Sequence, residues 1–384
     1  MEYNRNNIFN TEFTSKYAGF SIFLTIIMAI KIEALKPKDI PFLQDDKTLY
    51  SCDFRALGKC SSAASTAMWR YENLLSWIMK DRFVAVNECS ENLKYFHKNK
   101  HIIVPRGKEP RTSLFGRIDV KKLRSAGINA VWNAIPYPFA DEVSKKNSLA
   151  MNYGYDDFLR RNDKIWQKEL FGDLSPKWQK ISGGKDLEKI IAEHEKGFVK
   201  YRQGASGFMV FKVEEIQGNQ RFFKLFSKDF HGWYFEEFAE GISSSVQCMR
   251  CKAVGEVTIF GFTEQIIDDG RYFVGSKILP LWSVSYEVFC QIVRGIERIS
   301  PLLEDYEGFF GIDYIVDPAG RVHLLEVNTR LTAATIPTLI TSMVEQGGAI
   351  YMEDVLHSKA KGDDLVLTSL GDEIGSKYVD ILRF

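Results

Sequence analysis

The stretch from Gly308 to Thr335 restricts the fold more than any other part of the sequence. Two apolar runs rich in β-branched residues flank the turn segment Asp317-Pro318-Ala319-Gly320. Runs of this kind on either side of Pro and Gly predict two antiparallel strands joined by a tight turn. The sequence therefore predicts a β-hairpin, and the register of its strands decides which side chains share a face.

One register of this hairpin predicts three facing pairs: Val316 with Arg321, Asp313 with Leu324, and Glu326 with Gly311. Because side chains alternate between faces, Asp313, Glu326 and Asn328 then share one face. Asp313 and Glu326 become diagonal neighbours, roughly 5–8 Å apart at Cβ. Two carboxylates and an amide oxygen make an oxygen-rich site suited to Mg²⁺. The alternative is an ordinary edge hairpin whose acids face water.

This hairpin resembles the metal-binding hairpin of the ATP-grasp superfamily. In that family an acid on one strand and a Glu-x-Asn run on the next hold the magnesium ions of Mg-ATP. Asp313 and Glu326-Val327-Asn328 occupy the matching positions. Arg330 matches an arginine that steadies the acyl-phosphate or tetrahedral intermediate in many members. The resemblance implies ATP and Mg²⁺ as cofactors, with Mn²⁺ as an alternative ion.

Composition and charge describe a globular chain without a strong bias toward one kind of partner. The 384 residues are enough for two or three domains. Hydrophobic residues make up 45% and charged residues 26% of the chain, which is typical of globular domains. Because 50 basic residues balance 50 acidic ones, neither nucleic acid nor an anionic membrane is expected as a main partner.

The cysteines and the first apolar run give no sign of a secreted or membrane protein. Six cysteines in so long a chain do not predict a disulfide framework. The pair Cys248 and Cys251 forms one CxxC, which is either a metal or redox motif or two buried strand thiols. The apolar run from Ala18 to Ile30 is too short to span a bilayer. We expect a buried element there, with a signal segment as the alternative, and a cytoplasmic protein.

The segment before residue 155 predicts an α/β domain that follows a loose tail at residues 1–17. Its short apolar runs and helical stretches alternate, which is typical of parallel βαβ units. The expected strands are Phe83–Val86, His101–Val104 and Ile128–Ile135, and the expected helices are Ser61–Lys80 and Ser90–Lys98. No Gly-x-Gly-x-x-Gly run follows a strand, so a dinucleotide fingerprint is not predicted.

The family resemblance begins near Asn162. Asp163 is a good helix N-cap, and Lys164 and Lys168 then lie one turn apart on one helix face. D-alanine–D-alanine ligases have a similar Asp-Lys-x-x-x-Lys run whose second lysine contacts ATP phosphates, and Lys168 matches that lysine. The alternative is a solvated charged face.

A strand lysine and a glycine-rich loop come next. Lys200 ends an apolar run, and Gly204, Ala205, Ser206 and Gly207 follow it. Small residues allow backbone N–H groups to approach phosphate oxygens, and such a loop can close as a lid. The pattern resembles the ATP-grasp lysine, which contacts the α- and β-phosphates, and its mobile loop. A plain hairpin turn is the alternative.

The run from Trp233 to Gly241 resembles the linker that binds adenine in ATP-grasp proteins. There, backbone N–H and C=O groups pair with the adenine edge, and Glu236, Phe238 and Ala239 occupy the matching positions. Many members have an acid further on that binds the ribose, whereas this chain has serines. Glu240 is the candidate substitute. A core strand lined by aromatic residues is the alternative.

The resemblance covers residues 162–340 and implies the division of the chain. We expect a pre-ATP-grasp α/β domain at residues 18–155 and an ATP-grasp domain at residues 156–345. The latter consists of a glycine-loop lobe at about 190–240 and a metal-hairpin lobe at about 241–345. Residues 346–384 form a C-terminal extension. The fold class is therefore α/β and α+β, with two α+β lobes clamping ATP.

The resemblance also implies a reaction. We expect a carboxylate–amine ligase that forms an amide bond on an amino acid or small peptide through an acyl-phosphate, while Mg-ATP becomes ADP and phosphate. Arg330 and Lys200 are the predicted catalytic residues because positioning and charge dominate phosphoryl transfer. The alternatives are a kinase that phosphorylates a hydroxyl and a non-catalytic ATP-binding regulator. A homodimer is the default oligomeric expectation.

Overall fold

The computed structural model describes the chain from residue 29 onward, with gaps. The described residues are 29–51, 74–75, 77–79, 82–87, 100–104, 120–134, 145 and 148–384, without 205–206, 208, 269, 271, 345–347, 357–358, 360, 362 and 372–376. The predicted tail at 1–17, most of the Ser61–Lys80 helix and the whole Ser90–Lys98 helix lie outside them. Cys52, Cys60 and Cys89 also lie outside.

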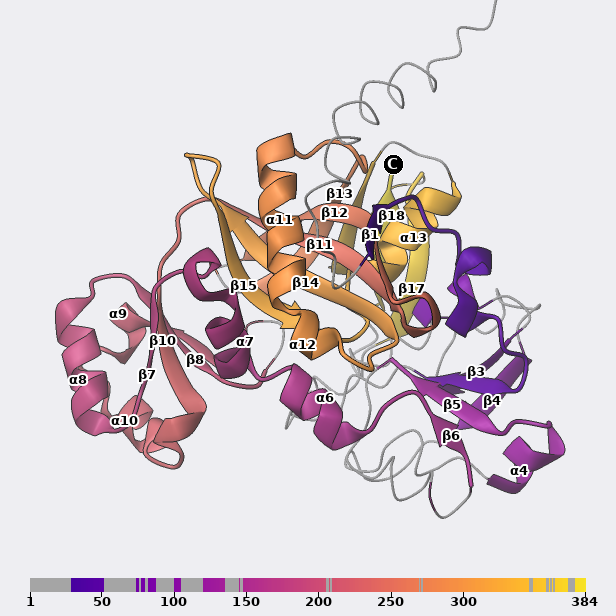
Figure 1. Cartoon of the computed structure of the whole chain (residues 1–384), viewed down its shortest axis with the longest axis horizontal. Coiled ribbons are helices and arrows are strands. Elements are labelled where there is room, and N and C mark those ends of the chain that lie inside the picture. Colours follow the sequence, from indigo (N-terminus) through magenta and orange to yellow (C-terminus); the bar gives the residue numbers. More distant parts are fainter. Residues whose placement is uncertain are drawn as a thin grey trace, which may run out of the picture.

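Three sheets organise the described part of the chain (Figure 1). A four-stranded sheet with its helices lies at one end, a large nine-stranded sheet lies in the middle, and a five-stranded sheet lies at the other end. We call the body built on the four-stranded sheet the small lobe and the body built on the nine-stranded sheet the large lobe.

The five-stranded sheet belongs to the N-terminal part, and all of its pairings are parallel. Its strand order is β4-β3-β2-β5-β6, a doubly wound order in which the first strand is central. The bounds are β2 Thr48–Ser51, β3 Phe83–Asn87, β4 Lys100–Val104, α4 Val120–Ser125, β5 Ala130–Asn133 and β6 Ala150–Met151. The predicted parallel arrangement is confirmed, and the expected strand at 128–135 is shorter than predicted.

The small lobe packs three helices on an antiparallel sheet of order β7-β10-β8-β9. Its elements are β7 Trp178–Lys180, α8 Gly184–Glu193, β8 Gly197–Tyr201, β9 Val210–Lys212, α9 Val213–Ile216, α10 Gln220–Phe226 and β10 Trp233–Glu237. Leu187 and Ile190 of α8 are buried against Val199 and Phe235 of the sheet. The predicted strand–loop–strand unit around Lys200 is β8 and β9.

The large lobe is built on a sheet of order β15-β14-β11-β12-β13-β16-β18-β17, with β1 paired to β12. Its strands are β1 Ala29–Ile32, β11 Ile242–Cys251, β12 Glu256–Asp268, β13 Tyr272–Leu279, β14 Gly308–Val316, β15 Val322–Asn328, β16 Ala349–Leu356, β17 Leu365–Gly371 and β18 Lys377–Arg383. The last three strands, which the sequence left unplaced, continue this sheet beyond β13. Residues 349–383 are therefore structurally part of the large lobe.

Helices cover both faces of this sheet. On one face, α11 (Tyr286–Arg298) and α12 (Ser300–Leu303) pack on β11, β12, β14 and β15. Val288, Ile292 and Ile296 of α11 are buried there, and their helical spacing in the sequence puts them on one face. On the other face, α13 (Thr335–Met343) shares a core with the N-terminal domain. No helix of the described segments combines the length and the hydrophobicity that crossing a bilayer requires.

Two further helices connect the N-terminal domain to the small lobe, α6 (Tyr155–Arg161) and α7 (Lys164–Phe171). Helix α7 also closes the open edge of the large sheet at β15. The Gln167 amide donates to Val327 O at 2.7 Å and accepts from Val327 N at 2.9 Å. Because an exposed strand edge invites further pairing, this side chain acts as a substitute partner strand and fixes α7 beside the hairpin.

A substitution at Gly275 tests whether the pairing of β13 with the C-terminal strand β16 stabilises the large lobe. A Cβ atom at this position would lie 2.3 Å from Tyr351 O and 3.1 Å from the Met352 Cα. Because β16 backbone atoms cannot yield as a side chain can, we expect Gly275→Ala to lower the free energy of unfolding by about 1–3 kcal/mol. Chemical denaturation measures this loss.

Gly184→Ala is the matched control, since the nearest atom to its added methyl is a Phe230 ring carbon at 3.8 Å. In helix α8 an alanine is at least as favourable as a glycine, so stability should hold or rise slightly. Equal stability of the two variants would contradict the tight packing of β13 against β16.

Candidate active site

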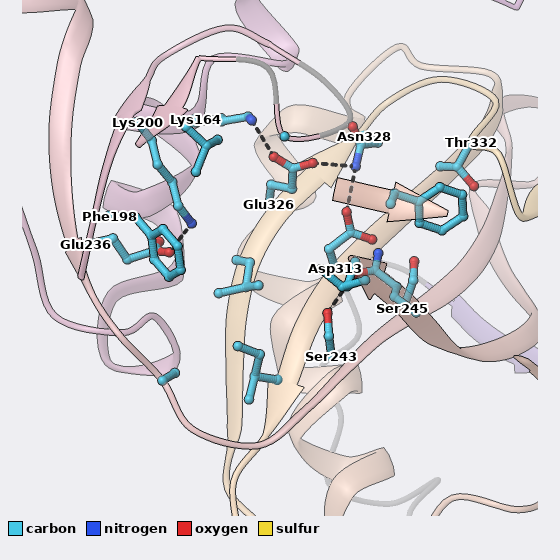
Figure 2. A pocket seen from close by; sticks show the side chains of 18 of the residues that line it. Lys164, Phe198, Lys200, Glu236, Ser243, Ser245, Asp313, Glu326, Asn328 and Thr332 are labelled. Atoms are coloured by element: carbon cyan, nitrogen blue, oxygen red, sulfur yellow. Dashed lines mark hydrogen bonds and ion pairs between the residues drawn. The ribbon is translucent and has the colours of Figure 1, made fainter. Parts of the chain in front are cut away.

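A cavity of about 350 Å³ lies between the small lobe and the large sheet, and both contribute to its wall. The small lobe contributes Lys200 and Glu236, and the hairpin of β14 and β15 contributes Asp313, Glu326 and Asn328. Figure 2 shows the two groups facing the same space. Most of the charged residues that the sequence analysis identified as candidates therefore line this cavity.

The hairpin has a different register from the predicted one. Asp313 pairs directly with Glu326, and Gly311 pairs with Asn328. A β-bulge after Asp313 shifts the register, so that Tyr314 pairs with Leu324 and Val316 with Val322. The predicted facing pairs were wrong for two reasons: next to the turn Val316 already pairs with Val322 instead of Arg321, and the bulge shifts the pairing by one more residue at Asp313. The shared face of Asp313, Glu326 and Asn328 is nevertheless what the structure has.

The pKa values of the two facing carboxylates are shifted in opposite directions. Burial and the adjacent Glu326 carboxylate raise the pKa of Asp313 to about 7. The pKa of Glu326 is lowered because, although burial opposes ionisation, the Lys164 ammonium 2.6 Å away favours the carboxylate. The Asn328 amide bridges the pair by donating to each carboxylate at 3.1 Å.

This donor set fits a divalent cation. Carboxylate and amide oxygens are the hard ligands that magnesium prefers, and its remaining positions usually go to water and phosphate. No group of three or more His, Cys, Asp or Glu residues suited to a metal occurs in the described residues. A magnesium ion here would rest on the two carboxylates and on oxygens from outside the protein. Asn328 would join them only after its amide turns, because its nitrogen faces the carboxylates and its oxygen accepts from Arg330. Burial and the adjacent Glu326 raise the pKa of Asp313, and a dication would offset the repulsion between the two carboxylates.

Lys164 and Lys168 lie one turn apart on α7, but only Lys164 lines the cavity. Asp163 caps the helix by accepting from Ile165 N at 3.0 Å, as predicted. Lys168 is fully buried behind the wall, where its ammonium donates to Leu324 O at 3.2 Å and pairs with Glu236. The structure therefore brings Lys164, and not Lys168, to the surface of the cavity.

Glu236 lies between two lysines. One carboxylate oxygen pairs with Lys168 and the other with Lys200. Burial favours the neutral acid, but the two ammonium groups outweigh it and lower the pKa of Glu236. Burial lowers the pKa of Lys168 to about 8 despite this pairing. Lys200 also lies over the Phe198 ring at 5.3 Å. Glu236 therefore holds Lys200 at the cavity wall.

The predicted adenine linker is only partly at the cavity. Phe238 and Ala239 line it, whereas Glu240 is exposed and lies outside the lining. Of the glycine loop, Gly207 lines the cavity and Gly204 does not. Ala205 and Ser206 lie outside the described residues. Cys248 and Cys251, the predicted CxxC, are both buried in β11.

Arg330 is buried beside the carboxylates and lines the cavity. Its guanidinium donates to Asn328 Oδ1 at 2.7 Å and to Leu331 O at 3.2 Å. These two acceptors hold the planar guanidinium at the cavity wall, and a planar cation suits an oxyanion or a carboxylate.

A chain of hydrogen bonds runs from the start of α13 to Asp313. Thr332 and Thr335 donate to Gln247 Oε1 at 2.7 and 2.9 Å, and the Gln247 amide donates to Ser245 Oγ at 3.0 Å. Ser245 in turn donates to Asp313 and opposes the rise in its pKa. Because each donor in the chain is directed toward Asp313, the chain orients that carboxylate.

Sequence reasoning missed several cavity residues, namely Ser243, Ser245, Gln247, Gln265 and Ser276. The first three occur at alternate positions of one strand, and alternate positions share a face. The Ser-x-Ser-x-Gln pattern at alternate positions of β11 was therefore the available signal. Gln265 and Ser276 had no comparable signal, because their place in the cavity wall depends on how β12 and β13 pair in the sheet.

We expect Glu236→Gln to lower the free energy of unfolding by about 3–5 kcal/mol. This substitution leaves the buried Lys168 ammonium without a counter-ion, which is costly in a protein interior. The matched control is the double variant Glu236→Leu/Lys168→Met, which replaces both buried partners with apolar groups and should recover most of the loss. Urea denaturation of the three proteins measures the difference, and equal losses in both variants would contradict the role of charge.

Comparisons with known proteins agree with this geometry. Residues 179–334 match the sequence profile of the ATP-grasp domain. The match spans the small lobe, the hairpin and Arg330, and it ends at the start of α13. No curated protein matches the sequence significantly.

Solved structures extend the likeness to most of the chain. Biotin carboxylase from Campylobacter jejuni, in complex with an ATP analogue, has a TM-score of 0.60 at 12% identity, covering 88% of this chain and 87% of its own. N5-carboxyaminoimidazole synthetase from Staphylococcus aureus, with ADP, has a TM-score of 0.57 at 13% identity, covering 89% and 95%. The biotin carboxylase domain of the Hydrogenobacter thermophilus 2-oxoglutarate carboxylase, with MgADP and bicarbonate, has a TM-score of 0.58 at 12% identity, covering 88% and 86%.

These proteins are carboxylases or a carboxyaminoimidazole synthetase, whereas the sequence resemblance pointed to amino-acid ligases. At such low identity the likeness concerns the fold. It confirms the predicted architecture of two lobes preceded by an α/β domain. The chain therefore carries an ATP-grasp domain and has the ATP-grasp fold.

Proposed function

We propose that this protein is an ATP-dependent ligase that joins a carboxylate to an amine nitrogen and forms ADP and phosphate. One observation carries the proposal: Asp313, Glu326 and Asn328 face Lys200 across a single cavity that Arg330 also lines. This arrangement offers a cation site and fixed positive charge in one cavity. Both are what the transfer of a phosphoryl group between anions requires.

In this proposal magnesium, or manganese in its place, is held by Asp313, Glu326 and Asn328. The backbone of residues 236–239 holds the adenine, and Gly207 with its neighbours in the loop covers the phosphates. Mg-ATP supplies charge neutralisation and the phosphoryl group that activates the carboxylate. A ribose contact from Glu240 requires that residue to move, since it is exposed outside the cavity.

The residues of the chain orient the reactants. Lys200 offers its ammonium to phosphate oxygens, and the buried Glu236 carboxylate limits the positions that this ammonium can take. Lys164, which is paired with Glu326 and lines the cavity, offers a further cation to a phosphate. Arg330 holds the carboxylate or its oxyanion, because Asn328 and Leu331 O fix its plane. The lobes exclude water from the activated carboxylate.

The substrates we propose are an amino acid or small peptide as the carboxylate and a second small molecule as the amine. The ATP-grasp run from Glu326 to Thr332 supports this choice through its resemblance to amino-acid ligases. A homodimer in the cytoplasm is the accompanying proposal. The neighbouring carboxylases make carboxylation of an amine the principal competitor, and a panel that includes bicarbonate distinguishes the two.

We expect Glu326→Ala to abolish magnesium-dependent turnover while the fold remains intact. Phosphate release from Mg-ATP is measured with purified protein against amino acids added singly and in pairs, and with bicarbonate plus each amine. Release that needs both a carboxylate and an amine is the expected result. The matched control is Glu304→Ala, which removes an exposed acid after α12 and should turn over normally.

Three results would contradict the proposal. Wild-type turnover in Glu326→Ala would remove the metal assignment. ADP formation with a phosphorylated hydroxyl product and no free phosphate would identify a kinase. Tight ATP binding without turnover on any combination would favour a nucleotide-binding regulator.

A further inference from the structure

The cavity has two chemically different halves. Its charged lining residues come from α7, the small lobe, the hairpin and the loop after it. None of the described residues that β11, β12 and β13 contribute to the wall carries a charge. That half is lined by a set of neutral polar side chains that we call the polar floor: Ser243, Ser245, Gln247, Gln265 and Ser276.

Strand register places the polar floor on one face of the large sheet. Gln265 pairs directly with Ser276 across β12 and β13, so the two side chains lie next to each other. The Gln265 carbonyl oxygen accepts from Ser243 Oγ at 2.7 Å. Gln247 is fully buried and is locked by the two threonine hydroxyls described above. The orientation of these groups is therefore set before any ligand arrives.

Ser276 differs from the rest of the polar floor. Its side chain is 0% exposed, and its Oγ has no hydrogen-bond partner among the described residues. Ser243, Ser245 and Gln247 each have a hydrogen-bond partner within the protein. A buried hydroxyl without a partner destabilises the fold, whereas an alanine at this position would not. A group that enters the cavity and bonds to Ser276 accounts for the serine.

We propose that the polar floor binds an uncharged hydrogen-bonding group of the carboxylate substrate, a carboxamide or an alcohol, and that Ser276 determines this specificity. The described residues that β12 and β13 contribute to the wall offer no opposite charge to a charged group beside Gln265 and Ser276, and burying such a charge is costly. An apolar group would leave the Ser276 hydroxyl unsatisfied. Phe273, also in the wall, packs against the alkyl part of the substrate. The identity of the molecule as a ligase substrate rests on the proposed function, whereas the chemistry of the subsite does not.

The first test needs no ligand. Ser276→Ala removes the unpartnered hydroxyl, so the midpoint of thermal unfolding of the ligand-free protein should rise by about 2–4 °C. Ser175→Ala is the matched control, because Ser175 is also buried with an unpartnered hydroxyl but lies outside the cavity lining. The control should gain similar stability. An unchanged or lower midpoint for Ser276→Ala alone would mean that a bound water already satisfies Ser276, and would overturn the proposal.

The second test uses amino acids of similar length with different end groups. Glutamine and homoserine are neutral and polar, glutamate and lysine are charged, and methionine is apolar. Their binding to the full chain in the presence of Mg-ADP is measured by calorimetry. We expect at least one of the two neutral polar probes to bind tightest, and its affinity to fall roughly tenfold in Ser276→Ala, the equivalent of one hydrogen bond. Ser175→Ala should bind as the wild type does.

The outcomes separate this inference from the proposed function. Tightest binding of a charged or apolar probe, no binding of either neutral polar probe, or an unchanged affinity in Ser276→Ala would overturn the inference. The expected binding pattern without phosphate release on any substrate pair would instead leave the subsite standing and remove the ligase function.

Discussion

The buried ion cluster of Lys168, Glu236 and Lys200 joins the parts on which the site depends. Lys168 comes from α7, Lys200 from β8 and Glu236 from β10. Helix α7 is itself fastened to the edge of the large sheet through Gln167 and through the bond from Lys168 to Leu324 O. Glu236 therefore ties the small lobe to the hairpin. Because a charge this deep needs its partners, the cluster holds the lobes at a defined spacing.

That spacing sets the chemistry of the cavity. The hairpin presents two facing carboxylates, where burial and the adjacent Glu326 carboxylate raise the pKa of Asp313, and the small lobe presents an ammonium held by Glu236. Lys164 offsets the charge of Glu326. The proposed function places a cation with phosphate oxygens between these groups. Among the described residues, those that β11 to β13 contribute to the wall carry no charge, which suits that half to recognising, not activating, a substrate.

Local sequence patterns predicted a large share of this arrangement. The turn at Asp317–Gly320, the cap at Asp163 and the buried stripe of α11 follow from turn chemistry, capping and helical periodicity. The bulge after Asp313 could not be predicted, because its position depends on how β14 pairs with its neighbours as well as on the turn. The burial of Lys168 against Glu236 could not be predicted either. The spacing of two lysines on a helix face does not determine which of them contacts Glu236.

The sequence by itself determined the chemistry that is available: an acid pair with an amide, strand and helix lysines, an arginine and a glycine loop in an order that the ATP-grasp family shares. Only the tertiary structure decided which of these groups meet. Lys164 reaches the cavity and Lys168 does not, the last strands complete the large sheet, and Ser276 lies beside Gln265. The physical reason is that residue type and periodicity are local, whereas strand order, register and burial arise from contacts between distant segments.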